Sequence, residues 1–241
     1  CENLLKKIMA KIFEENAYIQ TITTKVKNVD HENNTIELED EIFYAKSGGQ
    51  PGDVGRIIIG EEKIEVKDTI KSNGLIKNII EEKNILKIGE EIKAEIDWNK
   101  RYKYMRMHSA LHVMCAAIPL GVTGGQIRYE KSRLDFNDPE KQIVKEELQE
   151  KINRIMQEDH KITFEYIDSK ILESKPDLVR TMSVQPPKIN GKLRFVRIGN
   201  IDFQPCGGTH VKSTKEIGKI TIGKIENKGR MNRRVNILIN D

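Results

Sequence analysis

Two short motifs, far apart in the chain, each carry a pair of metal-ligand side chains separated by three residues. The first is His108-x-x-x-His112 and the second is Cys206-x-x-x-His210. Residues i and i+4 of a helix lie on one face, so the two histidines of the first motif can reach a common ion. The run 105–115 around them contains no Gly or Pro and is rich in helix formers, which predicts a helix there.

The second motif contains two adjacent glycines at 207–208. Each glycine costs about 1 kcal/mol in a helix, so we expect a tight loop that can bend the thiolate and the imidazole together. The two motifs supply three imidazoles and one thiolate, a donor set that suits tetrahedral Zn²⁺. We therefore expect one zinc ion to be bound by His108, His112, Cys206 and His210. The first motif lacks the glutamate of H-E-x-x-H, which excludes a zinc protease of that type.

The composition is that of a heavily charged globular chain with enough apolar material for a core. Of its 241 residues, 37% are hydrophobic and 32% are charged. There is no apolar run near the ~20 residues of a membrane span and no signal-peptide pattern, so we expect a cytoplasmic protein without membrane contact. Three irregularly spaced cysteines argue against a disulfide framework and for a reducing compartment. The net charge of +4 is compatible with a polyanionic partner but does not establish one.

Short runs of alternating β-branched and polar residues fill the first 96 positions, and they predict a small β-barrel or curled sheet. The expected strands cover residues 18–26, 35–39, 57–59, 64–66 and 92–96. A glycine-rich loop at 43–55 interrupts them. Its Gly48 and Gly49 would let the backbone approach another molecule or another element closely, although a plain tight turn is the alternative. Gln50 follows with an amide that can both donate and accept hydrogen bonds.

From residue 97 onwards the pattern changes to mixed α and β. Asp97 is expected to cap the helix of the histidine pair, which would end near Pro119, and Asp138-Pro139 to open a second, long helix. Further strands are expected at 126–130, 132–136, 162–166 and 193–198, followed by a short-helix connector at 170–187 and a terminal hairpin within 218–239. We therefore predict an α+β fold with a β-rich domain at 1–96 and an α/β domain at 97–241.

The predicted zinc ligands alone leave the role of the metal open. Four protein ligands are typical of a structural site, because catalytic zinc usually keeps an open position. Ser109 beside His108 and Thr209 beside His210 indicate a polar pocket, in which zinc could activate water against an ester carbonyl. Three hypotheses follow: hydrolysis of an activated acyl group, a non-catalytic zinc-stapled RNA-binding module, and a zinc hydrolase of small esters.

The ordered set of motifs resembles the alanyl-tRNA editing proteins (AlaX), free-standing relatives of the editing domain of alanyl-tRNA synthetase. The resemblance covers nearly the whole chain and rests on residues 43–55, 97–112, 133–136, 206–211 and 216–218. It implies a medium-length member in which a small β-barrel-like domain precedes a two-layer α/β editing domain with the zinc site. It also implies hydrolysis, in trans, of the aminoacyl ester of tRNA(Ala) wrongly charged with serine or with glycine.

The resemblance assigns roles to individual residues of this chain. Gln50 and Ser109 are expected to be catalytic, although Ser109 stands where the family usually has threonine, and Ser47 where it usually has glycine. Contacts with the aminoacyl group or the acceptor-stem phosphates are expected from Gly48, Gly49, Arg101, Thr209, Arg230 and Arg233. The implied partner is the acceptor stem of tRNA(Ala) carrying serine or glycine, bound by a monomer or a homodimer.

Overall fold

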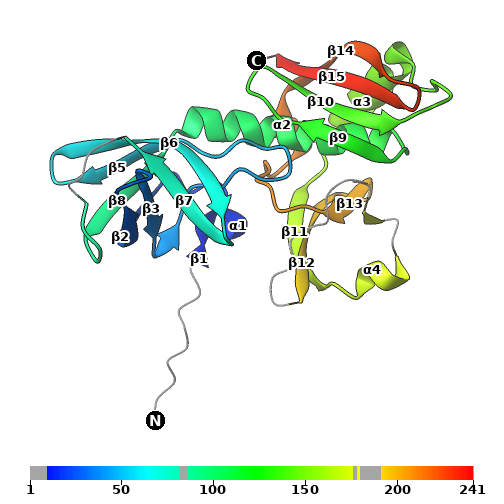
Figure 1. Ribbon diagram of the computed structural model, residues 1–241. Helices are drawn as coiled ribbons and strands as arrows, with labels where there is room; N and C mark the ends of the chain where they lie inside the picture. Colours follow the sequence, from blue (N-terminus) through cyan, green and yellow to red (C-terminus); the bar gives the residue numbers. More distant parts are fainter. Residues whose placement is uncertain (1–9, 82–85, 176–177, 180–190, 241) are drawn as a thin grey trace. The chain divides into compact units, whose positions relative to one another are not determined.

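The computed structural model describes residues 10–81, 86–175, 178–179 and 191–240. The chain divides into two compact units, residues 1–47 with 52–101, and residues 48–51 with 102–241 (Figure 1). The division falls within helix α2 (Trp98–Ala117), close to the boundary expected between residues 96 and 97. Residues 48–51, the tip of the glycine-rich loop, belong to the second unit rather than to the first.

The first unit is a closed barrel of antiparallel strands in the order β2-β3-β7-β6-β5-β8. Its strands are β2 (Thr21–Asp30), β3 (Thr35–Leu38), β5 (Gly55–Ile59), β6 (Glu62–Ser72), β7 (Leu75–Ile80) and β8 (Glu91–Ile96). Beside them, the short strands β1 (Ala10–Lys11) and β4 (Asp40–Glu41) pair in parallel, and α1 (Ile12–Glu15) follows β1. The expected small barrel is confirmed.

Alternation along the barrel strands creates the barrel core. In β8, Ile92, Ala94 and Ile96 are buried while the residues between them face outward, as the period of a strand requires. In β6, Ile64 and Val66 alternate in the same way. These side chains join one apolar cluster inside the barrel, so the pattern visible in the sequence is also the packing pattern.

The second unit contains two antiparallel sheets, a four-stranded sheet in the order β14-β15-β10-β9 and a three-stranded sheet in the order β11-β12-β13. Its elements after α2 are β9 (Val122–Gln126), β10 (Lys131–Asn137), α3 (Lys145–Gln157), β11 (Ile162–Asp168), α4 (Ile171–Ser174), β12 (Lys192–Ile198), β13 (Asp202–Pro205), η2 (Thr214–Ile217), β14 (Lys219–Lys228) and β15 (Asn232–Asn240). α3 is tied to β14 by Gln149, whose side chain bonds the backbone of Ile220 and Ile222.

Two expectations for this unit are wrong. The strand expected at 126–130 lies earlier in the chain, because β9 already ends at Gln126. The second helix begins at Lys145 rather than after Pro139, because the Asp138 carboxylate accepts hydrogen bonds from the backbone N–H groups of Gln142 and Ile143 and closes a loop there.

The connector expected at 170–187 contains the short helix α4, and its two adjacent prolines lie outside the described residues. Among the helices that the structure describes, none is both long enough and apolar enough to cross a lipid bilayer.

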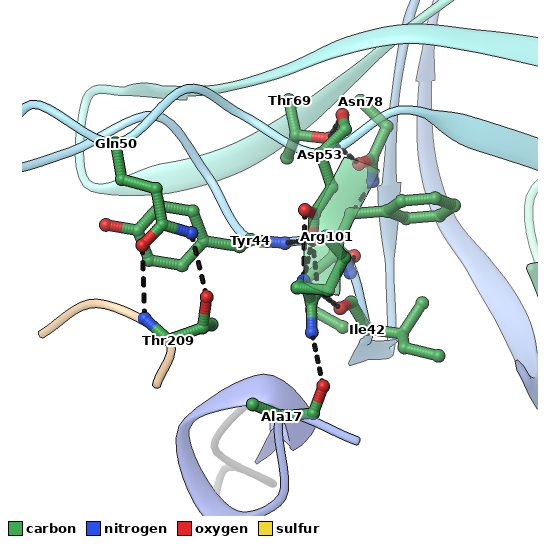
Figure 2. Close-up of polar contacts among 11 residues, drawn as sticks. Ala17, Ile42, Tyr44, Gln50, Asp53, Thr69, Asn78, Arg101 and Thr209 are labelled. Atoms are coloured by element: carbon green, nitrogen blue, oxygen red, sulfur yellow. Dashed lines mark hydrogen bonds and ion pairs between the residues drawn. The ribbon is translucent and has the colours of Figure 1, made fainter. Parts of the chain in front are cut away.

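Arg101, in the first turn of α2, is fully buried within the first unit (Figure 2). Its Nε lies 3.0 and 2.8 Å from the two carboxylate oxygens of Asp53, and its Nη2 also contacts that carboxylate. The remaining donors reach the backbone oxygens of Ile42 (2.8 Å) and Ala17 (3.0 Å). The expectation that Arg101 binds tRNA phosphates is therefore wrong, because its guanidinium is enclosed and already paired.

Further buried polar groups support the Asp53 end of this pair (Figure 2). The Asp53 carboxylate accepts from the backbone N–H of Tyr44, and its backbone oxygen accepts from the Thr69 hydroxyl at 2.9 Å. Nearby, the Asn78 amide donates to the Glu41 carboxyl at 2.9 Å, and burial raises the pKa of Glu41 to about 8. The segment that leads into and out of the glycine-rich loop is thus fixed to the barrel by paired polar groups.

Replacing Arg101 with Met should lower the free energy of unfolding by about 3–5 kcal/mol, because it leaves the Asp53 carboxylate buried without its cation. The matched control is Arg56→Met. Arg56 also pairs with a carboxylate, that of Glu95, but it is 47% exposed and its loss should cost less than about 1 kcal/mol. Denaturant unfolding of both variants measures the difference, and equal losses would contradict this account of the pair.

Candidate functional site

Helix α2 places His108 and His112 one turn apart, with ring centroids separated by 5.3 Å. Both imidazoles are almost completely buried, at 7% and 6% exposed. From Met107 to Cys115 every residue of α2 is buried, so packing rather than solvent surrounds this part of the helix. The helix expected from the sequence is confirmed, and it presents both imidazoles in one buried region.

The Cys206 loop begins directly after β13 and is fastened to β12. Cys206 donates its backbone N–H to the backbone oxygen of Arg194, whose Nη1 donates in return to the backbone oxygens of Cys206 (2.8 Å) and Gly208 (3.0 Å). A Cβ atom at Gly208 would lie 2.0 Å from Cε1 of His108, so a side chain cannot fit at this position. The glycine therefore allows the loop to approach the helical histidines.

The four predicted ligands converge. One ligand atom from each of His108, His112, Cys206 and His210 lies within 4.8 Å of the others. The Cys206 Sγ lies 3.5 Å from Nε2 of His108 and 3.3 Å from Nε2 of His210. Atoms bound to one tetrahedral zinc at about 2.0–2.3 Å lie roughly 3.3–3.8 Å apart. The cluster could therefore hold a metal ion, and its spacing fits zinc.

The outward-facing nitrogen of each imidazole has a hydrogen-bond partner. The Nδ1 partners are Gln50 Oε1 for His108 (2.8 Å), Asp202 Oδ2 for His112 (2.9 Å) and Ser109 Oγ for His210 (3.1 Å). The oxygens of Gln50 and Asp202 can only accept, so Nδ1 of His108 and of His112 carries the hydrogen. In the neutral imidazole of this tautomer Nε2 keeps its lone pair for a metal, the arrangement found around histidine ligands.

At two of the four positions, Cys206 and His210, the surroundings lower the pKa and so favour the deprotonated form that can bind a metal. Burial raises the pKa of the Cys206 thiol, but the His108 and His210 imidazoles outweigh it and hold that pKa well below its ordinary value. Burial and the neighbouring His108 lower the pKa of His210 well below its usual range. At His112 burial is outweighed by the Asp202 carboxylate and Cys206, which raise the pKa to about 10. Binding a metal through His112 Nε2 must therefore displace a proton.

Gln50 is fully buried and joins the two motifs within the second unit. Besides accepting from His108, its Oε1 lies 3.2 Å from the backbone N–H of Thr209, and its Nε2 donates to the Thr209 hydroxyl at 2.8 Å (Figure 2). The backbone N–H is an obligate donor, which fixes the orientation of the amide. The structure places Gln50 beside His108, and its expected contact with substrate stays a prediction.

Ser109 is also fully buried and lies behind His210. Its hydroxyl oxygen additionally accepts from the backbone N–H of Val211 at 3.3 Å. Ser109 therefore fastens the second motif to α2, in the same way as Gln50 fastens the loop tip to His108. A direct role for Ser109 in catalysis stays a prediction.

Asp202 and Gln204 belong to the site but were missed by the sequence reasoning. Asp202 orients His112, and Gln204 donates to the Asp202 carboxylate at 2.9 Å while lying 3.1 Å from His112 Nδ1. Both side chains are buried polar groups on β13, the strand that leads to Cys206. The signal available in the sequence was their alternation, since residues two apart on a strand share a face.

Gly48 and Gly49 form an exposed turn in the left-handed region, with φ of 53° and 82°. The backbone oxygen of Gly49 accepts from the N–H of Ile127 at 2.9 Å. A Cβ at Gly49 would lie only 3.1 Å from the backbone oxygen of Gly125. The alternative of a tight turn against another element thus accounts for these glycines, and substrate contact at the turn stays a prediction.

Arg230 and Arg233 lie on the β14–β15 hairpin. Arg230 is exposed in the turn, whereas Arg233 is half-buried and donates to Asn227 Oδ1 (3.1 Å) and to the backbone oxygen of Ile143 (3.4 Å). Part of the Arg233 guanidinium is therefore engaged within the unit, and Arg230 is the more accessible cation of the two.

Comparisons with known proteins point to aminoacyl-tRNA chemistry. The family described as threonyl and alanyl tRNA synthetase second additional domain matches residues 193–236, and class II (A) tRNA synthetases match residues 5–100. The chain is 33% identical over 235 residues to the alanyl-tRNA editing protein AlaX-M of Methanosarcina mazei, which covers 91% of this chain and 92% of AlaX-M.

Two longer relatives match with similar identity. The alanyl-tRNA editing protein AlaX-L of Pyrococcus horikoshii is 33% identical over 230 residues, which is 92% of this chain but 56% of AlaX-L. The alanine–tRNA ligase of Staphylothermus marinus is 34% identical over 227 residues, or 90% of this chain and 24% of the ligase. The chain thus spans about half the length of AlaX-L and a quarter of the ligase.

Replacing Gly208 with Ala should lower metal affinity at least tenfold, because the added methyl group would occupy the space of the His108 ring. Gly124→Ala is the matched control, since a Cβ there would meet its nearest atom, in the Asp135 side chain, at an ordinary 3.4 Å. Metal content after dialysis against a competing chelator compares the two variants. Full retention of metal by Gly208→Ala would contradict the assignment of His108 as a ligand.

Proposed function

The chain belongs to the alanyl-tRNA editing proteins, and we propose that it hydrolyses, in trans, the ester of tRNA(Ala) wrongly charged with serine or glycine. The observation that carries this proposal is the convergence of three imidazoles and one thiolate in a polar, largely buried cluster. The chain aligns with AlaX-M over 92% of AlaX-M's length, which supports an editing function of that type.

We propose Zn²⁺ as the ion, held by His108, His112, Cys206 and His210. When bound, and with its coordination expanded beyond the four protein ligands, it would polarise an ester carbonyl and lower the pKa of a coordinated water. Cys206 is the least buried of the four ligands, which makes its side of the cluster the open approach for a substrate. A free thiolate survives in a reducing environment, so we propose the cytoplasm as its location.

The residues around the ligands would hold the site in one geometry during the reaction. Gln50 keeps Nδ1 of His108 protonated and fixes Thr209, and Ser109 holds the His210 ring through its Nδ1. Preorganised donors and ligands cost no rearrangement when charge develops on the ester. We propose that hydroxyl and amide groups around the ligands also read the serine hydroxyl, since an alanyl ester would leave such polar groups unpaired. This contact separates seryl from alanyl esters and does not act on glycyl esters, which lack the hydroxyl.

Arg230 and Arg233 are the residues proposed to contact phosphates of the acceptor stem. Both are carried by the β14–β15 hairpin, and Arg230 is exposed. A cation that binds phosphate releases a counterion, so such contacts strengthen binding most at low salt. Arg101 is not part of this set because it is buried in the first unit.

The four protein ligands also favour a second candidate, a zinc-stapled module that binds tRNA(Ala) without catalysis. A third candidate is a zinc hydrolase of small esters that needs no RNA. Incubation with Ser-tRNA(Ala), Gly-tRNA(Ala) and Ala-tRNA(Ala), with and without chelator, separates the three. The proposal predicts chelator-sensitive loss of the seryl and glycyl esters while the alanyl ester survives.

Two results of that assay would contradict the editing function. Intact esters in the presence of stoichiometric zinc and tRNA binding would favour the non-catalytic module. Equal hydrolysis of seryl-tRNA and a seryl methyl ester, without benefit from the RNA, would favour the small-ester hydrolase.

Replacing Gln50 with Ala should lower kcat for seryl-tRNA hydrolysis by about 10- to 100-fold, because Nδ1 of His108 loses its acceptor. Gln50→Glu is the matched control, since its carboxylate can still accept from His108 and from the backbone of Thr209. Single-turnover kinetics at equal zinc content measures the effect. Unchanged kinetics in Gln50→Ala would contradict a role of Gln50 in the reaction and leave the loop with a structural role alone.

A further inference from the structure

Two exposed aromatic side chains stand together on β11, the edge strand of the three-stranded sheet (Figure 1). Phe164 is 40% exposed and Tyr166 is 39% exposed. Their rings contact each other edge to face, with centroids 6.2 Å apart and an interplanar angle of 84°. Neither ring belongs to the cluster of three histidines and Cys206, and each exposes apolar surface to solvent.

The strand register places this aromatic pair on the face of the sheet that serves the ligand cluster. Phe164 pairs with Val196, and Val196 pairs with Gln204. Directly opposite residues of antiparallel strands share a face, so Phe164 and Gln204 lie on the same face. Gln204 contacts His112 and Asp202 on that face. The aromatic pair therefore lies on the metal-facing side of β11–β13.

Arg194 connects the aromatic pair to the metal loop. It is the direct cross-strand partner of Tyr166, and its guanidinium carbon lies 4.5 Å from the centroid of the Phe164 ring. Its Nη1 also donates to the backbone oxygens of Cys206 and Gly208. The Cys206 loop, the buried Arg194 guanidinium and the Phe164 and Tyr166 rings are thus in contact one after another.

The opposite face of the same sheet carries a different pair of an arginine and an aromatic ring. There the guanidinium of Arg197 covers the Phe203 ring at 3.9 Å and pairs with the Glu165 carboxylate at 2.8 Å. Phe203 is half-buried, whereas Phe164 and Tyr166 are exposed on the face of Gln204.

We propose that Phe164 and Tyr166 form the stacking site for the unpaired 3′-terminal adenine of the tRNA, an inference that rests on the proposed function. Single-stranded RNA ends are recognised by bases stacked on aromatic rings beside arginine. The terminal adenosine carries the amino acid on its ribose, so seating its base on these rings would leave the ester toward the Cys206 loop. Arg194 adds positive charge beside the rings, which complements the phosphate and the π-face of the base.

A second copy of the chain is the competing occupant, since an edge strand can pair with another edge. β11 carries Glu165 and Asp168, both exposed, and charged side chains on an edge oppose such pairing. Arg194, which contacts both the Phe164 ring and the Cys206 loop, favours RNA.

The test compares binding of uncharged tRNA ending in CCA with the same tRNA lacking its terminal adenosine. Wild-type protein should bind the complete tRNA roughly 5- to 100-fold more tightly, the range given by stacking one base on an aromatic ring. Phe164→Ala with Tyr166→Ala should bind both tRNAs equally. Phe164→Tyr should keep the preference because it keeps an aromatic ring.

Tyr129→Ala is the matched control, because Tyr129 is 46% exposed and belongs to the same unit but lies outside this sheet. It should keep the preference for the terminal adenosine. Zinc content and circular dichroism of each variant confirm that the rings were removed from an intact protein.

Three results would overturn the stacking site: no preference for the terminal adenosine in the wild type, an unchanged preference in the double variant, or a wild-type dimer that the double variant converts to a monomer. Failure of the proposed function is distinguishable from these. A protein that leaves seryl-tRNA intact, yet loses its terminal-adenosine preference in the double variant, would keep the stacking site and lose the hydrolase.

Discussion

Three imidazoles and one thiolate lie within a few ångströms of one another in the second unit, and the packing around them depends on this cluster. Burying these polar groups is unfavourable unless each one is paired. The chain meets this requirement with Gln50 behind His108, Asp202 behind His112 and Ser109 behind His210. The glycine at 208 serves the same purpose, since it lets the loop touch the helical histidine. These partners hold the three imidazoles beside Cys206 in one cluster that could bind a metal ion.

The glycine-rich loop has a root and a tip with different partners. At its root, Asp53 and the backbone of Ile42 are bound to Arg101 within the first unit. Its tip, with Gln50, is bound to His108 and Thr209 within the second unit. The root and the tip are therefore each held by buried polar contacts within their own unit.

The sequence predicted the histidine helix and the barrel because each is encoded locally. Spacing on a helix determines which histidines share a face, and alternation determines which strand residues are buried. Arg101 was misassigned because a basic cluster looks the same in a sequence whether its members are solvated or enclosed. Its partner Asp53 is distant in the chain, so only the tertiary structure reveals the pair. The late start of α3 had a similar origin, since Asp138 closes a loop instead of capping a helix.

The coordination of one metal by these four side chains can be measured directly by zinc-edge X-ray absorption on protein purified with its native metal. The account predicts three nitrogen neighbours at about 2.0–2.1 Å and one sulfur neighbour at about 2.3 Å. A first shell that contains no sulfur would contradict it, because Cys206 could then not be a ligand and the two motifs would not share an ion.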